Sequence, residues 1–177
     1  MKKHRLILFA LVLLTLFCAC APKINQTKPN NNYADTSPTA TPVYEPYALF
    51  FPDSANAYLV KETQELQVTE TVRPEMRILS ALKRGPKGDD LISPIPKDCE
   101  ILSVKTLSGL CTIDVSDTFS NTDTQENYPL LIQSIVHSLC QLETVNEVKI
   151  NIGGKQDVTV GDIDLSKPLS PDDSYLK

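Results

Sequence analysis

A tight β-hairpin in the middle of the sequence constrains the fold of this chain more than any other feature. Apolar residues recur over residues 101–107 and 110–115, and Ser108-Gly109 joins the two runs. Glycine accepts the positive φ that a tight hairpin turn requires. On the second arm, Cys111 and Ile113 fall on one face and their polar neighbours on the other. This period of two predicts a strand with one buried side.

Two segments with a helical period of apolar residues separate the predicted strands. The first begins at Pro74, because a missing N–H costs nothing in the first turn, and ends before Gly85-Pro86. Its predicted buried stripe is Met76, Leu79 and Leu82. The second runs from Tyr128 to Leu142, with Asn127 as the predicted N-cap. The apolar face of this second helix consists of Leu131, Ile132, Ile135, Val136, Leu139 and Leu142.

Short apolar runs predict the remaining strands. They cover residues 47–51, 57–60, 66–72, 148–152 and 158–160. Pro52-Asp53 is a predicted turn, and Gly153-Gly154 is the predicted hairpin turn between the last two strands. The order is then three strands, a helix, two strands, a helix and two strands. It predicts an α+β fold, in which a mixed, mostly antiparallel sheet has both helices packed on one face.

Residues 1–20 have the composition of a secretion signal. Positive residues precede an apolar run over residues 6–17, which is shorter than the roughly 20 residues of a membrane-spanning helix. The run ends in Phe17-Cys18-Ala19-Cys20, which resembles a bacterial lipobox and makes Cys20 the predicted site of lipidation. Cys18 is the rival site, but bulky Phe17 precedes it. An ordinary signal peptide is the alternative, and it would export the protein without the lipid anchor that holds a diacylated protein on a membrane.

Composition divides the rest of the chain into a tether, a domain and a tail. Residues 21–46 hold five prolines and three successive asparagines without apolar periodicity, so they predict a disordered tether. A flexible chain of that length spans on the order of 25–30 Å. The folded domain is predicted over residues 47–169, and a flexible tail over residues 170–177.

The charge of the expected mature protein disfavours nucleic acid as a partner. Three of the 17 cations lie in residues 1–20, which leaves 14 cations against 22 acidic residues and a net charge of −8. A surface with this excess of acidic groups repels phosphates.

The residues that could carry chemistry do not form a catalytic or metal-binding pattern. The expected mature chain has one histidine, His137, which lies among polar residues of the second helix and is predicted to be solvated. The sequence contains neither a GxSxG motif nor a CxxC pair. Asp114 and Asp117 are predicted to make turn and cap hydrogen bonds. The sequence therefore predicts a protein that is not an enzyme and binds no cofactor or metal.

Three cysteines fall within the predicted domain. Cys99 lies seven residues beyond the position opposite Cys111 on the hairpin, which is roughly 20 Å and too far for a disulfide. Cys111 faces the predicted core, and Cys140 lies near the apolar face of the second helix. Two alternatives stay open for this pair: a disulfide, as exported proteins can form, or two buried free thiols.

Short motifs along the domain occur together in one known family. The segments are 49–53, 58–60, 81–87, 93–96, 109–116 with Phe119, and 148–155. In this order and spacing they resemble the GerM domain (GerMN) family, known from sporulation and spore germination lipoproteins. The resemblance covers about Tyr47 to Leu169. It implies a fold related to the ring-building motif, whose small α/β modules pack side by side in secretion and sporulation-channel rings.

The resemblance, the lipobox and the tether lead to three hypotheses of function. The first is a non-enzymatic extracytoplasmic lipoprotein on the cell membrane, whose single GerM-like domain binds another envelope protein or a further copy of itself in sporulation or spore germination. The second is a module that binds cell-wall glycan or peptide. The third is a hydrolase of unknown type.

Overall fold

The computed structural model describes residues 41–120 and 128–177, and these residues belong to one compact unit. Its strands form three sheets. The first sheet contains β1 (Val43–Pro52) and β2 (Leu59–Val68), the second β3 (Ile101–Leu107), β4 (Gly109–Val115) and β5 (Val145–Ile152), and the third β6 (Thr159–Val160) and β7 (Ile163–Asp164). The helices are α2 (Pro74–Arg84), α3 (Tyr128–Cys140) and the short 3₁₀ turns η1 (Asp117–Ser120) and η3 (Asp173–Tyr175).

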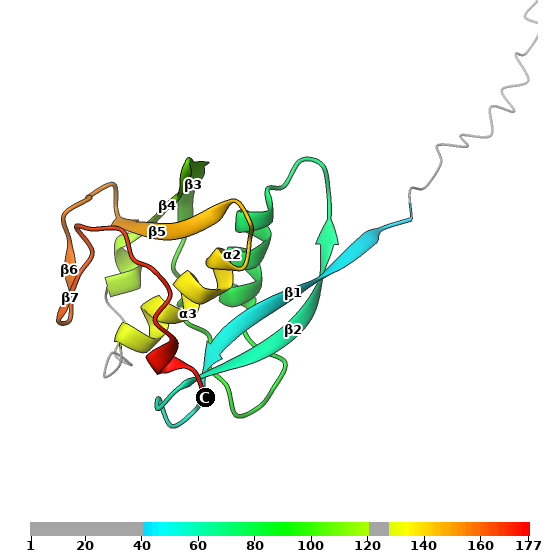
Figure 1. Cartoon of the computed structure of the whole chain (residues 1–177), viewed down its shortest axis with the longest axis horizontal. Helices are drawn as coiled ribbons and strands as arrows, with labels where there is room; N and C mark the ends of the chain where they lie inside the picture. The colour runs from blue at the N-terminus through cyan, green and yellow to red at the C-terminus, as the bar shows by residue number, and fades with distance from the viewer. Residues whose placement is uncertain (1–40, 121–127) are drawn as a thin grey trace, which may run out of the picture. The chain divides into compact units, whose positions relative to one another are not determined.

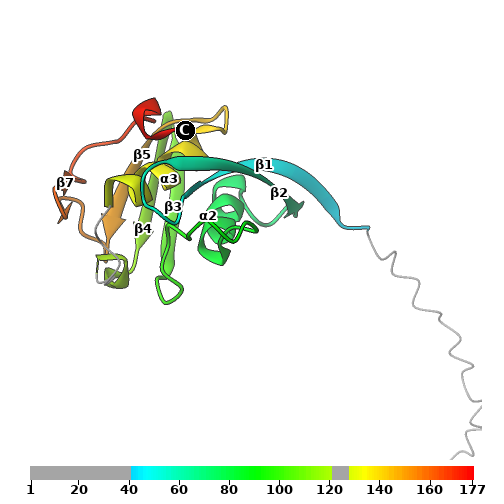
Figure 2. The same cartoon turned by 90° about the horizontal axis from the view of Figure 1, so that it is seen from below.

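The predicted α+β class and the mostly antiparallel pairing are confirmed. β4 and β5 are parallel, and the other strand pairs are antiparallel. The parallel pair is possible because α3 carries the chain from the end of β4 back to the start of β5. The strands form separate sheets rather than one, and α2 and α3 lie between the β1–β2 ribbon and the three-stranded sheet (Figures 1 and 2).

The central hairpin forms as the sequence predicts. Leu107 pairs with Leu110 across Ser108 and Gly109, whose φ values of 50° and 88° are those of a type I′ turn. On β4, Cys111 and Ile113 are fully buried against the helices. The alternation in the sequence therefore gives the correct inward face of this strand.

The first helix has the predicted bounds and most of the predicted buried stripe. α2 begins at Pro74 and ends at Arg84, with Gly85 after it at φ 99°. Leu79 and Leu82 of the predicted stripe are completely buried, and so is Ile78, whereas Met76 is only half-buried. The prediction is therefore correct at Leu79 and Leu82 and wrong at Met76, because α2 packs against β1 and β2 as well as against β3.

Three strands were expected before α2, and the structure has two long ones. Residues 57–60 and 66–72 were predicted as separate strands, but β2 is continuous from Leu59 to Val68 and pairs with β1 along its whole length. β1 begins at Val43, so the last four residues of the predicted tether belong to a strand. Continuous pairing satisfies the backbone groups that a break in β2 would leave open.

The end of the chain differs from the prediction in two ways. Gly153-Gly154 does form a tight turn, in which Ile152 bridges to Lys155, but β6 pairs with β7 and not with β5. The tail predicted to be flexible is folded onto the domain. Leu176 forms a parallel bridge with Leu59 at the start of β2, and the backbone N–H of Asp172 donates to Gln133 of α3. Just before the tail, Leu169 forms an antiparallel bridge with Val148.

Candidate functional site

The one residue that the sequence assigned to a functional site, Cys20, lies outside the described residues, as does the predicted cap Asn127. No helix within residues 41–120 and 128–177 is long and apolar enough to cross a membrane. In the same part of the chain, no group of three or more histidine, cysteine or acidic residues is placed to hold a metal ion.

His137 is buried against the folded chain, so the prediction that its side chain is solvated was wrong. Its side chain is 7% exposed, its ring centroid lies 5.2 Å from that of Phe50, and its Nε2 lies 3.1 Å from the backbone oxygen of Asp172. The C-terminal segment causes this burial, because Gln133 also accepts a hydrogen bond from the backbone N–H of Asp172. A backbone carbonyl and a phenyl ring hold His137 in place, which is a structural role.

The polar side chains of α3 satisfy the backbone of the β1 edge that β2 leaves open. Ser138 Oγ accepts from the N–H of Phe50 at 2.9 Å, and Ser134 Oγ donates to the carbonyl of the same residue. Gln141 makes the equivalent pair with Ala48: its Oε1 accepts from the N–H at 2.8 Å, and its Nε2 donates to the carbonyl. Ser134, Ser138 and Gln141, which have the composition of a solvated helix face, therefore act as a substitute strand.

Residues 49–53, the first segment of the family resemblance, close the loop between β1 and β2. Asp53 Oδ1 accepts hydrogen bonds from the N–H groups of Ala57 and Tyr58. Burial alone would raise the pKa of Asp53, but these backbone bonds outweigh it and lower the pKa. Leu49 and Phe51, from the same motif, are completely buried. The residues of this motif therefore stabilise the loop and the adjoining core.

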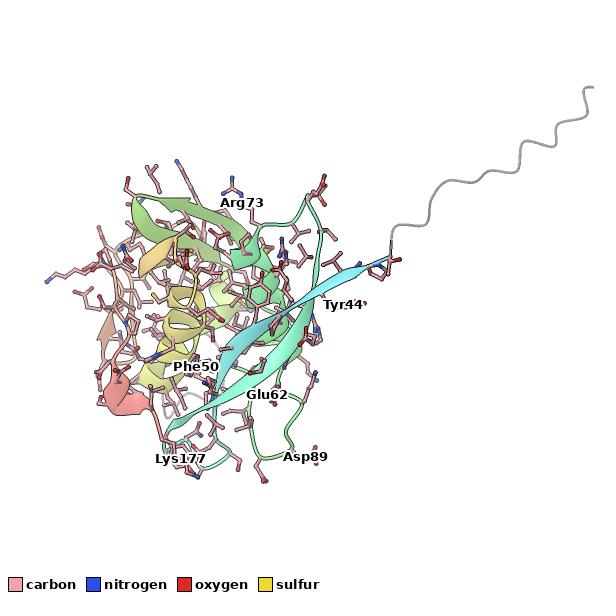
Figure 3. All side chains as sticks on the ribbon, turned by 45° about the vertical axis from the view of Figure 1, so that its right-hand side comes forward. Tyr44, Phe50, Glu62, Arg73, Asp89 and Lys177 are labelled. Atoms are coloured by element: carbon pink, nitrogen blue, oxygen red, sulfur yellow. The ribbon has the colours of Figure 1, made fainter. Side chains whose placement is uncertain are left out.

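Glu62 on β2 fixes the loop that follows α2. Its carboxylate accepts from the N–H groups of Lys87 and Gly88 at 3.0 Å and from Gln64 Nε2 at 2.6 Å. Partial burial would raise the pKa of Glu62, but these hydrogen bonds lower it overall. Figure 3 shows Glu62 on β2 and Asp89 in the loop below it, while Tyr44 lies at the end of the β1–β2 ribbon away from Lys177.

Replacing Glu62 by glutamine is expected to lower the free energy of unfolding by about 1–2 kcal/mol at neutral pH, because charge-assisted hydrogen bonds to two backbone N–H groups are lost. The folded-state pKa is lowered, so the wild-type advantage is full above roughly pH 5 and is lost as the pH falls through that pKa. Urea unfolding of the wild type and the Glu62→Gln variant at several pH values measures this difference in the free energy of unfolding. Exposed Glu65, changed to glutamine on the same strand, is the control, and an equal loss in both variants would contradict the assignment.

Residues 109–116 and 148–155, two later segments of the family resemblance, contribute to the turn after β5. Asp114 Oδ1 accepts from the N–H of Gly154 at 3.0 Å, and a Cβ at Gly153 (φ 57°) would lie 2.6 Å from Asp117 Oδ1. Asp117 also lies 3.6 Å from the ammonium of Lys155, in an exposed ion pair. The predicted turn hydrogen bond is therefore confirmed for Asp114, whereas the side chain of Asp117 forms an ion pair beside the turn.

The three cysteines of the domain are free thiols. The structure thus favours the second of the two alternatives left open for Cys111 and Cys140. Burial raises the pKa of Cys140 to about 11, and burial also raises the pKa of Cys111 and of Cys99. Thiols with raised pKa values react slowly as nucleophiles, so these cysteines act as small apolar side chains.

The outer edge of β3 is unpaired in the part of the chain that the structure describes. β3 is an edge strand, and no bridge or backbone hydrogen bond outside the β3–β4 ladder falls on it in the described part of the chain. Leu107 is 66% exposed and Leu102 is 49% exposed. The outer edge of β2 differs, because it carries charged residues such as Lys61 and Glu65, and the bridge to Leu176 covers its start. An edge with exposed leucines can add a strand from another chain.

β3 is held in position by a buried polar contact with α2. Thr106 Oγ1 donates to Glu75 Oε1 at 2.6 Å, and Glu75 is buried among the residues of α2. This contact fixes the strand whose outer edge is open.

Comparisons with known proteins agree with this geometry. A family model described as sporulation and spore germination, the Germane family, matches residues 48–158. No curated protein shows significant similarity to the chain. The first GerMN domain of the sporulation protein GerM from Bacillus subtilis is 25% identical, with a TM-score of 0.61 over 71% of this chain and 97% of that one.

Two further structures share the fold. The tandem GerMN domains of the same Bacillus subtilis protein are 24% identical, with a TM-score of 0.62 over 72% of this chain. The match spans 46% of the tandem structure, which is less than half its length. A protein from Clostridium perfringens, described as a candidate lipoprotein, is 23% identical, with a TM-score of 0.51 over 73% of this chain and 89% of that one. Since the family model matches more than half of its residues, the chain belongs to the Germane family of sporulation and spore germination.

Proposed function

We propose that this protein is a non-enzymatic lipoprotein on the extracytoplasmic face of the cell membrane, anchored through Cys20. Its Germane domain binds another envelope protein through the outer edge of β3, and it does so in sporulation or spore germination. The tether of residues 21–42 gives the domain reach from the membrane to this partner.

The observation that carries the proposal is the open edge of β3 with its two exposed leucines. Seven residues of strand offer backbone donors and acceptors, and Leu102 and Leu107 add apolar area beside them. Proteins usually protect such edges with charges, bulges or covering loops, since an open edge pairs with other chains. β3 carries a bulge near Leu102 and one lysine, Lys105, which leaves most of the edge available.

The membrane anchor rests on the lipobox-like segment that ends at Cys20 and on the description of the Clostridium perfringens relative as a candidate lipoprotein. The role in sporulation or germination rests on the family description. The same edge could also pair with a second copy of the chain, and the experiment separates that outcome from binding to another protein.

The test uses tagged full-length protein in cells at the stage when it is expressed. We expect radioactive palmitate to label the wild type and not the Cys20→Ala variant. The double variant Leu102→Lys and Leu107→Lys keeps the label but loses its co-purifying envelope protein, because two buried ammonium groups would face the added strand.

The matched control places the same charges on another exposed apolar pair, Val43→Lys with Tyr44→Lys. We expect this control to retain the partner. Equal loss of partner in both double variants, or recovery of the chain only with copies of itself, would contradict binding of an envelope protein through β3.

A further inference from the structure

Positive charge is concentrated on α2, β3 and the loop that joins them. Residues 73–107, which comprise these elements, have seven lysine and arginine residues and five acidic ones. The rest of the described chain has five lysines against fourteen acidic residues. The formal net charge is therefore +2 for residues 73–107 and −9 for the remainder. A partner that meets β3 thus meets the basic part of an otherwise acidic domain.

The five acidic residues of this stretch do not line the outer edge of β3. They are Glu75, Asp89, Asp90, Asp98 and Glu100. The first is buried, the next two lie in a loop that hydrogen-bonds to the β1–β2 turn, and the last two precede the strand. Lys105 is the one charged residue within β3 itself.

α2 runs alongside β3 and brings two cations to its edge. The contact between Thr106 and Glu75 puts the first turn of α2 beside the end of β3. Arg73, which precedes this turn, is exposed and lies beside the three-stranded sheet in Figure 3. Burial raises the pKa of the Cys99 thiol, and among the smaller opposing effects is the charge of Lys83. Lys83, in the last turn of α2, therefore lies near the start of β3.

Lys105 adds a third cation on the other face of the sheet. It is exposed and pairs with Thr112, whereas the buried residues of β4 pair with Val104 and Thr106. Its side chain therefore points away from the helices. Within the described residues, no acidic side chain lies within ion-pair distance of any of these three cations.

The backbone of β3 offers hydrogen-bonding groups at the same edge. Leu107 and Leu110 flank a two-residue turn, and residues in that position exchange hydrogen bonds with each other. Alternate residues of an antiparallel strand bond in opposite directions. Val104 and Thr106 therefore point their N–H and C=O groups away from β4. An added segment of about five residues reaches both of them.

We propose that the strand added to β3 is an extended acidic segment of the partner protein, an inference that rests on the proposed function. Its acidic side chains lie beside Arg73, Lys83 and Lys105, and an apolar side chain packs on Leu107. Backbone pairing accepts many sequences, so the charges select the partner. A second copy paired through its own β3 would bring a second set of cations to the edge, and like charges disfavour that pairing.

The test titrates the full-length protein with a fluorescent pentapeptide of alternating glutamate and valine, capped at both ends, and follows its anisotropy. We expect saturable binding that weakens as salt is added, with matching shifts of the Val104 and Thr106 amide signals in NMR. Lysine in place of glutamate should weaken binding roughly tenfold or more. N-methylation of every backbone nitrogen keeps the charge, removes the donors and should weaken it equally. Failure of the glutamate peptide to bind, or equal binding of either altered peptide, would overturn the proposal.

Charge reversal on the protein tests the cations. Arg73→Glu with Lys105→Glu changes two exposed side chains, so the melting temperature should stay close to that of the wild type, and affinity for the glutamate peptide should fall roughly tenfold or more. The matched control, Lys61→Glu with Lys167→Glu, makes the same change in net charge at exposed positions away from β3. It should keep the affinity within about twofold, because salt screens distant charges. Equal loss in both would overturn the proposal.

Co-purification from cells distinguishes this inference from the proposed function. The Arg73→Glu and Lys105→Glu protein should lose the envelope protein, as should the Leu102→Lys and Leu107→Lys protein. If only the leucine variant loses it, the partner is not selected by charge, so this inference fails and the proposed function stands. If neither loses it, both fail.

Discussion

Replacing Ser134 and Ser138 together by alanine is expected to lower the free energy of unfolding by about 2–4 kcal/mol. Both side chains are completely buried, and both bond to the backbone of Phe50. Alanine leaves the N–H and the carbonyl of Phe50 without their partners at a partly buried edge. Each unsatisfied buried group costs about 1–3 kcal/mol. Urea denaturation of wild type and variant measures the difference.

The control for this variant is Ser80→Ala, which makes the same change on an exposed position of α2. Its effect should stay within about 0.5 kcal/mol, because alanine also has the higher helix propensity. If the double variant were as stable as the Ser80→Ala protein, α3 would not be acting as a substitute strand for β1.

Thr106→Val is expected to destabilise the domain by about 2–3 kcal/mol, although it changes neither size nor shape. The threonine hydroxyl donates at 2.6 Å to the carboxylate of Glu75, which is buried between α2 and β3. Valine leaves this carboxylate without that donor. Removing one partner from a buried charged contact costs far more than the intact contact contributes. Chemical unfolding gives the size of the effect.

A double-mutant cycle with Glu75→Met tests the same contact. In that background the cost of Thr106→Val should fall to a few tenths of a kcal/mol, because no buried carboxylate remains. Thr112→Val, on the neighbouring strand and facing away from the helices, is the matched control for the loss of a hydroxyl. A full-sized effect of Thr106→Val in the Glu75→Met protein would show that the hydroxyl acts on something else.

The sequence predicts correctly those elements whose determinants lie within them. The central hairpin depends on Ser108-Gly109, and both residues take the positive φ values that the turn requires. α2 begins at Pro74 and ends before Gly85, where proline and glycine act through their own backbone preferences. Such local rules need no knowledge of the rest of the fold.

The errors have long-range causes. The polar face of α3 is buried because β1, which lies 84–93 residues earlier in the chain, presents an open edge to it. The one signal of this contact in the sequence was the spacing of Ser134, Ser138 and Gln141, which puts all three on one side of the helix. A solvated helix face has the same composition, so the spacing alone could not predict burial. His137 is covered by the C-terminal segment, which is held by bridges at Leu169 and Leu176 and by hydrogen bonds between α3 and Asp172. None of these contacts leaves a pattern in the sequence.

The family-like motifs proved more informative about folding than about chemistry. Asp53 closes the loop of the β1–β2 ribbon, and Asp114 holds the turn after β5. The surface that could be functional, the edge of β3, lies largely outside the segments that carried the resemblance. Exposed Leu102 and Leu107 were counted in the sequence as part of the hairpin's apolar pattern, and only the three-dimensional structure shows that they face solvent.

Site-specific photo-crosslinking from position 107 in the full-length protein, in intact cells, tests the central claim most directly. With a photoreactive amino acid in place of Leu107, the account predicts one discrete product that joins this chain to a different envelope protein. The same reagent at exposed Lys167 should give no such product. The absence of a product at position 107, or the same product from both positions, would contradict a role for the β3 edge in binding.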